Sequence, residues 1–215
     1  MRYPNAFKGV RKIFLAEVLM LLTAILGVVL LFMVDRNSME VAGELVVNNS
    51  IKRTATILTI AAAVIALLAF LLNLAGVINA RRDNENFRVA LFVTILGILA
   101  GGVSAVWSSN ERLVKWMDTA TTLCSLFASY YVLTGIAELA QTYPDNATKA
   151  LAEKSRNLLC ATFAVPALIR IAVMLFRIQN ETVLIILSVA ALLLELVSYV
   201  VYMRALSRGK QMLSA

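Results

Sequence analysis

The side chains best suited to chemistry in this chain are a few charged and hydroxyl groups that lie inside long apolar runs. Asp118, Thr122, Ser125 and Ser129 recur at steps of four, three and four residues, which places them on one face of a helix. Arg170 lies in a later apolar run. Charges at membrane depth cost at least ~2.5–3.5 kcal/mol each, so they face a protein interior or water and have partners. These five residues are therefore the candidate ligand-binding set.

We expect Asp118 and Arg170 to pair, because both lie near the same end of their apolar runs and a carboxylate satisfies a guanidinium. Pro166, four residues before Arg170, removes a helical hydrogen bond and should bend or open the helix. Either the two residues form a structural salt bridge, or the kinked helix presents the Arg170 cation to an anionic ligand. The hydroxyl stripe either lines a water-filled, outward-open cavity or forms a helix–helix contact.

Glu195 and Glu17 are the two protonatable candidates within the apolar runs. Ser188, Ala191 and Ser198 share the helical face of Glu195, so this face is expected to point into the bundle. Two interpretations are open for Glu195. It either exchanges protons during transport, or it is a neutral acid held by neighbouring hydroxyl groups.

Several kinds of chemistry are disfavoured by the composition. The chain has no histidine, which argues against imidazole metal sites and serine–histidine catalysis. It has no P-loop, no dinucleotide fingerprint and no CxxC motif. We therefore predict no catalytic residue, no metal site and no cofactor, and we expect the chain not to be an enzyme. The net charge of +7 lies in short segments between apolar runs, where it sets membrane topology rather than binding nucleic acid.

The elements that must position these residues are transmembrane helices. Hydrophobic residues make up 60% of the chain and charged residues 15%, with a mean hydropathy of +0.82, well outside the range of soluble domains. We predict an all-α bundle of six transmembrane helices in three consecutive antiparallel hairpins, embedded in the lipid bilayer as one domain, residues 1–215. The predicted spans, each near the ~20 residues that cross a bilayer, are 13–34, 55–78, 89–107, 116–140, 158–176 and 183–203.

Basic residues predict the orientation. Thirteen Lys and Arg residues lie in the segments on one side of the spans and six in those on the other, so the positive-inside rule places both termini in the cytoplasm. Trp107 and Trp116 flank the turn between spans three and four, as expected at an outer interface. The plasma membrane is the expected location.

Two further segments carry structural predictions. The outer segment 35–53 is expected to be either a short amphipathic helix or a loose loop. Gly97 and Gly101 form a GxxxG pattern, which we expect to serve packing between helices of this chain rather than dimerisation. Cys124 and Cys160 lie in different spans at different depths and are expected not to form a disulfide.

The sequence thus favours a small transport-type or solute-binding membrane protein, with a polar cavity on the outer side between spans four and five. The alternative is a non-catalytic accessory or scaffold subunit that binds a membrane or cytoplasmic partner subunit. The length and helix count are similar to those of the substrate-binding membrane subunits of vitamin-uptake transporters. That likeness is one of shape and implies no site residues.

Overall fold

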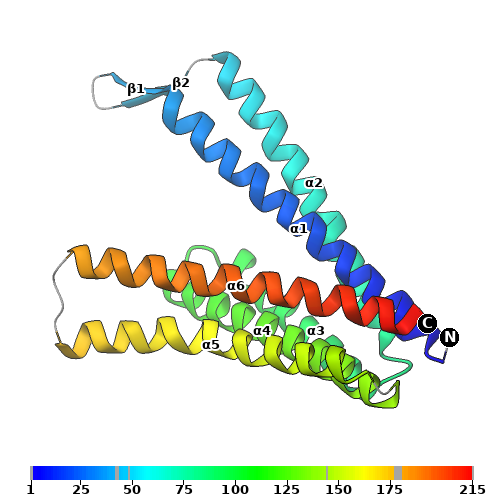
Figure 1. Cartoon of the computed structure of the whole chain (residues 1–215). Coiled ribbons are helices and arrows are strands. Elements are labelled where there is room, and N and C mark those ends of the chain that lie inside the picture. Colours follow the sequence, from blue (N-terminus) through cyan, green and yellow to red (C-terminus); the bar gives the residue numbers. More distant parts are fainter. Residues whose placement is uncertain (1, 42–43, 48, 144, 177–180, 215) are drawn as a thin grey trace. The chain divides into compact units, whose positions relative to one another are not determined.

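The computed structural model is built almost entirely of helices (Figure 1). It describes the backbone of residues 2–41, 44–47, 49–143, 145–176 and 181–214, and their side chains except at 35–41, 44–47, 49–50, 167–168, 170–176, 181 and 184. The elements are α1 (Pro4–Asn37), β1 (Ser38–Val41), β2 (Glu44–Val47), α2 (Asn49–Ala80), α3 (Glu85–Val106), α4 (Glu111–Thr142), α5 (Asn146–Phe176) and α6 (Glu181–Ser214). The prediction of an all-α bundle in consecutive hairpins is confirmed.

The described helices α1, α2, α3, α4 and α6 are each long and apolar enough to cross a membrane. They indicate a multi-pass membrane protein. A crossing by α5 stays a prediction, because many side chains of its second half lie outside the described residues. Its first turns, before the predicted span 158–176, carry the polar and charged residues Lys149, Glu153, Lys154 and Arg156. The helix continues through Pro166 without a break.

The chain divides into two compact units, and the boundary passes through α1 and α2. Unit 1 contains Met1–Arg11 and Gly76–Ala215, and unit 2 contains Lys12–Ala75. Both helices run continuously through the boundary. The prediction of a single membrane domain is not decided by this division.

Unit 2 corrects the prediction for segment 35–53. The helix α1 continues to Asn37, and an antiparallel hairpin follows in which Ser38 pairs with Val47 and Val41 with Glu44. In the described parts of the segment, 35–41, 44–47 and 49–53, the residues between the two long helices are strands rather than an amphipathic helix or a loose loop. Residues 42, 43 and 48 lie outside the described residues. The valines at 41, 46 and 47 explain the difference, since β-branched side chains favour strands over helices. Apolar side chains of α1 and α2 are exposed, as lipid-facing residues are. Leu31 and Phe32 of α1 are each 72% exposed.

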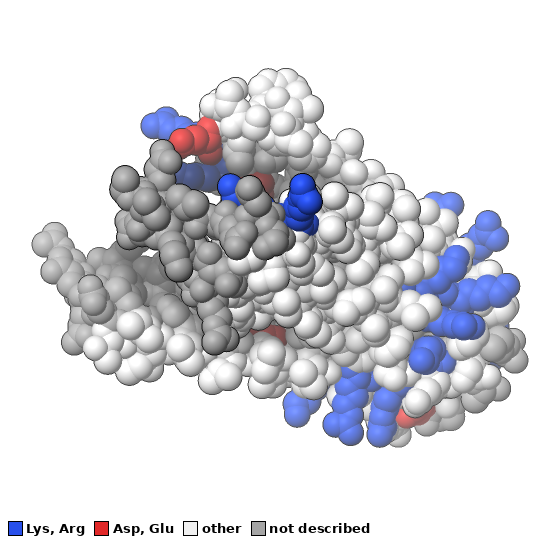
Figure 2. Space-filling view, turned by 90° about the horizontal axis from the view of Figure 1, so that it is seen from above, with Lys and Arg blue, Asp and Glu red and all other residues white. Residues whose placement is uncertain are grey.

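In unit 1, α4 packs against α3, α5 and α6, and α5 packs against α6. The fully buried side chains concentrate at one end of this unit, where Phe87, Leu133, Ile136 and Leu206 are all inaccessible. We call this the basic end, because Lys and Arg side chains gather over it (Figure 2). Here α1, α3 and α5 begin, α2, α4 and α6 end, and both chain termini lie (Figure 1).

Packing between α3 and α4 uses the predicted GxxxG pattern. A Cβ atom added to Gly97 would lie 3.0 Å from the Cβ of Cys124, and one added to Gly101 would lie 3.9 Å from the hydroxyl of Thr121. Both contacts are within this chain, which confirms the prediction of internal packing. Cys124 and Cys160 are free. Trp107 and Trp116 flank the turn between the two helices and are 54% and 73% exposed.

Candidate functional site

The predicted outer site lies on the face of α4 near the tryptophan-flanked turn. Asp118, Thr122 and Ser125 are exposed and Ser129 is half-buried. The carboxylate of Asp118 accepts a hydrogen bond from the hydroxyl of Ser104 on α3 at 2.9 Å. The Thr122 hydroxyl donates to the backbone carbonyl of Asp118. The side chain of Arg170 lies outside the described residues, so its pairing with Asp118 remains a prediction, as does a cavity between the two helices.

The two protonatable candidates lie elsewhere. Glu195 on α6 is exposed, whereas Ser198 and Tyr202 on the same helix are buried. Ser188 is exposed and Ala191 half-buried. The exposure of Glu195 within unit 1 does not decide whether it points into the bundle, so this expectation stays a prediction. The buried face of α6 within the unit begins one turn further on, where α6 enters the packed basic end. Glu17 is half-buried on α1.

The basic end is held together by a carboxylate that caps a distant helix. Asp83, in the turn after α2, accepts hydrogen bonds from the backbone N–H of Ala6 at 2.7 Å and from the amide of Asn5 at 2.9 Å. The first N–H groups of α1 have no partner within the helix, and a negative charge there also complements the helix dipole. Pro4 at the first helical position needs no donor. Asp83 thereby fixes the start of α1 to the α2–α3 turn.

A second set of contacts fixes the extreme N-terminus to the end of α4. The backbone N–H of Arg2 donates to the hydroxyl of Tyr143 at 3.1 Å, and the ring of Tyr3 meets that of Tyr143 edge to face at 5.9 Å. Asn84, the N-cap of α3, also donates its amide to Glu138 on α4 at 3.0 Å. Residues from α1, α3 and α4 are therefore fixed together at the basic end.

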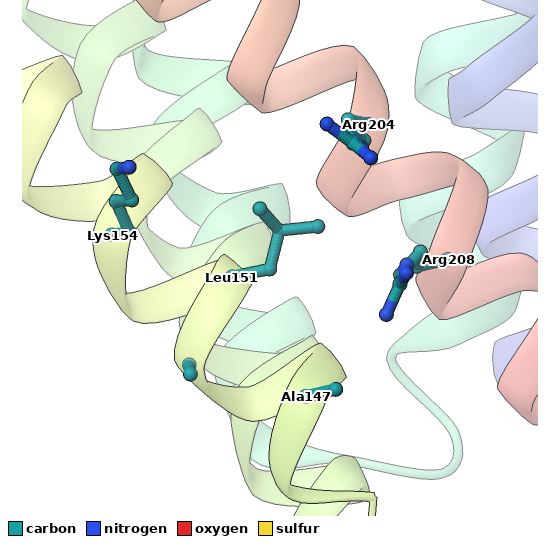
Figure 3. Close-up of a pocket in the computed structure, with 6 residues that line it drawn as sticks. Ala147, Leu151, Lys154, Arg204 and Arg208 are labelled. Carbon is teal, nitrogen blue, oxygen red and sulfur yellow. The ribbon is translucent and has the colours of Figure 1, made fainter.

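Lys and Arg side chains gather over this end of the molecule (Figure 2). Within unit 1, a groove of about 310 Å³ opens there between the first turns of α5 and the last turns of α6. Arg204 and Arg208 come from α6, and Leu151 projects from α5 into the space between the helices (Figure 3). We call this space the α5/α6 groove. Its lining residues are Ala147, Ala150, Leu151, Lys154, Arg204 and Arg208.

The α5/α6 groove has a strongly positive lining. It is lined by three cations and no acid, and among the described side chains no carboxylate lies within ion-pair distance of Lys154, Arg204 or Arg208. The acid of Glu153 on the same helix is instead 4.0 Å from Lys149. Three like charges on two packed helices repel one another, and an anion between them relieves that repulsion.

Asp145 lies close enough to the groove for its charge to interact with that of Arg208. Its carboxylate is hydrogen-bonded at the start of α5. Its carboxylate accepts hydrogen bonds from the hydroxyl of Thr148 at 2.6 Å and from the Thr148 backbone N–H at 3.0 Å. These bonds, with smaller help from the N–H of Ala147 and the charge of Arg208, lower the pKa of Asp145 from its ordinary value. Asp145 is thus an anionic N-cap of α5, and its oxygens are occupied by Thr148.

The α5/α6 groove was missed from the sequence, although its residues carried a visible signal. In the sequence alone, Lys154, Arg204 and Arg208 are three of the thirteen basic residues that predict the orientation. Lys154 lies fifty residues from Arg204 in the chain, so their convergence depends on how α5 and α6 pack. The four-residue step between Arg204 and Arg208 does place both on one helical face, and this was the available clue.

Comparisons with known proteins add no relative to this picture. No protein-family model, curated protein or solved structure matches the chain.

Proposed function

We propose that this chain is a multi-pass membrane protein of the solute-binding or transport type that binds a phosphate-bearing anion in the α5/α6 groove. The observation that carries the proposal is the lining of the groove, with three cations and no acid on two packed helices. Arginine presents a planar fork of N–H donors that matches two phosphate oxygens at once, and lysine adds a point charge. The groove contains no histidine or cysteine, and the proposed role is binding rather than catalysis.

The proposal places the α5/α6 groove at the cytoplasmic face. The excess of Lys and Arg over this end supports that orientation through the positive-inside rule, with both termini in the cytoplasm and both tryptophans at the outer boundary. A plasma-membrane location is part of the same proposal. An anion site on this side takes its ligand from the cytoplasm or from the inner leaflet.

Thermal unfolding of the detergent-solubilised full chain tests the proposal. Inorganic phosphate, added at constant ionic strength against chloride, should raise the melting temperature, because a ligand that binds the folded state stabilises it. The double variant R204Q/R208Q should lose this rise. The matched variant R112Q/K115Q, which removes two exposed cations at the start of α4, should keep it. An equal rise in both variants, or none in the parent chain, would overturn the proposal.

The exposed polar stripe on α4 supports a second candidate function, that of an accessory or scaffold subunit. A face carrying Asp118, Thr122 and Ser125 is unfavourable against lipid, so it faces either water, as in an outer cavity of a transporter, or a partner subunit. A cysteine placed at Ser125 separates the two. A membrane-impermeant thiol reagent should modify it from outside if the stripe lines a water-filled cavity, whereas a partner helix should block the reaction.

A further inference from the structure

We infer that the ligand of the α5/α6 groove is the head group of an anionic phospholipid from the inner leaflet. Its phosphate would lie between Arg204, Arg208 and Lys154, and its glycerol and first acyl carbons would lie against Leu151. This inference rests on the proposed function and narrows its ligand from any phosphate-bearing anion to a membrane lipid.

The depth of the three cations in the membrane favours a lipid ligand. Arg204 follows the last residue of the predicted sixth span directly, and Arg208 lies one helical turn further on. At ~1.5 Å per residue, these positions are about 1.5 and 7.5 Å beyond the hydrocarbon boundary. Lys154, four residues before the predicted fifth span, is about 6 Å beyond it. The head-group layer on each side of a bilayer is about 5–8 Å thick, so all three cations lie at the depth of lipid phosphates.

The composition of the groove lining also favours a lipid. Half of the lining residues are apolar, namely Ala147, Ala150 and Leu151 on α5. A small hydrated anion gains nothing from an alkyl surface, but an amphipathic ligand buries its own carbon atoms there. Leu151 projects toward α6 between the basic side chains (Figure 3). Cations beside an apolar wall at the membrane surface are the pattern that suits a lipid head group.

The positive charge of the lining favours a lipid with a net negative head group. Phosphatidylglycerol and phosphatidylcholine carry the same phosphate, but choline adds a positive charge that three lining cations would repel. The α5/α6 groove has no carboxylate to bind choline. It should therefore discriminate strongly between these two lipids, whereas nonspecific binding of acyl chains to the exposed helices should not.

Native mass spectrometry of the full chain in mild detergent tests the inference, with phosphatidylglycerol and phosphatidylcholine of identical acyl chains as probes. The parent chain should bind one phosphatidylglycerol at least about tenfold more tightly than phosphatidylcholine, and R204Q/R208Q should lose this preference, since each cation near a lipid phosphate contributes about fivefold. R112Q/K115Q is the matched control and should retain it. L151Q should weaken phosphatidylglycerol binding, because Leu151 is the apolar surface against which the glycerol and first acyl carbons would lie.

The outcomes separate this inference from the function on which it rests. If inorganic phosphate stabilises the chain through the two arginines but both lipids bind equally, the lipid inference fails and the proposed anion site stands. If L151Q leaves phosphatidylglycerol binding unchanged, the lipid is not seated in the groove as inferred. If neither phosphate nor phosphatidylglycerol depends on Arg204 and Arg208, both proposals fail.

Discussion

Gly135 of α4 faces the ring of Phe87 of α3 at a distance that leaves no room for a side chain. A Cβ atom added at position 135 would lie 2.8 Å from Cε2 of Phe87 and 3.0 Å from its Cζ. Phe87 is completely buried, so its ring has no open space into which to move. This close approach is central to the packed basic end.

Gly135→Ala should therefore lower the free energy of unfolding by about 1–3 kcal/mol, the usual cost of overpacking a core. The matched control is Gly102→Ala on α3, where an added Cβ meets nothing within 4 Å. That substitution should be neutral or stabilising by up to about 1 kcal/mol, because alanine favours helix. Denaturant unfolding of both variants measures the difference. In the Phe87→Leu background, Gly135→Ala should cost less, and an unchanged cost would show that the ring is not the obstacle.

The start of α1 approaches the end of α2 still more closely, and at Gly9 the neighbouring atoms include backbone atoms of α2. A Cβ on Gly9 would lie 2.6 Å from the carbonyl oxygen of Gly76 and 2.6 Å from the Cβ of Ala80. Gly9→Ala should destabilise the chain by about 3 kcal/mol, at the upper end of overpacking effects, because backbone atoms cannot rotate away. Gly27→Ala on the same helix, with open space around it, is the control and should not destabilise. Equal melting temperatures for the two variants would contradict the packing described here.

The cap formed by Asp145 predicts a pH dependence. Because the pKa of Asp145 is lower in the folded than in the unfolded chain, the carboxylate stabilises the fold above its ordinary pKa of 3.8. That contribution is lost as the pH falls below this value. Asp145→Ala should cost about 1 kcal/mol at neutral pH, and this difference from the parent chain should shrink below about pH 4. Asp145→Asn keeps a capping side chain without the titration, so a cost that stays constant down to pH 3 in Asp145→Ala would rule out the ionised cap.

At the opposite end, Asp118 is the centre of a predicted polar pair. The observed bond from Ser104 should couple the two residues by about 0.6 kcal/mol, typical of hydrogen bonds between membrane helices. The predicted salt bridge to Arg170 should couple much more strongly. Removing either charged partner alone should cost several kcal/mol, and replacing both with apolar residues should restore much of that loss. A double-mutant cycle on thermal stability measures both couplings, and additive effects of the Asp118 and Arg170 substitutions would exclude the salt bridge.

The sequence predicted the helices well because apolar runs of about 20 residues have few other solutions in a membrane protein. It predicted their ends poorly. The helix α6 continues past Arg204 to Ser214, since Ala205, Leu206 and Leu213 bury an apolar face in the basic end. That face depends on which helix packs beside it, and hydropathy alone does not supply this information.

The site was harder to predict for the same reason. Asp118 and its stripe stood out because polar residues are conspicuous inside an apolar run. Lys154 and Arg208 lie in basic segments where the positive-inside rule already accounts for them. Only the packing of α5 against α6 shows that they share a groove, and only the caps formed by Asp83 and Asp145 show that the nearby acids are engaged elsewhere.

The central claim is that the α5/α6 groove is an anion site on the cytoplasmic face, and cysteine labelling at Ala150 tests it most directly. Ala150 lines the groove and is exposed, and replacing it removes no charge. In a background with both native cysteines changed to alanine, Ala150→Cys should be inaccessible to an impermeant thiol reagent in intact cells and should react after permeabilisation. Inorganic phosphate should then slow that reaction, but not the reaction of Asn146→Cys at the first residue of α5. Labelling in intact cells would contradict the orientation, and phosphate-independent labelling after permeabilisation would contradict the anion site.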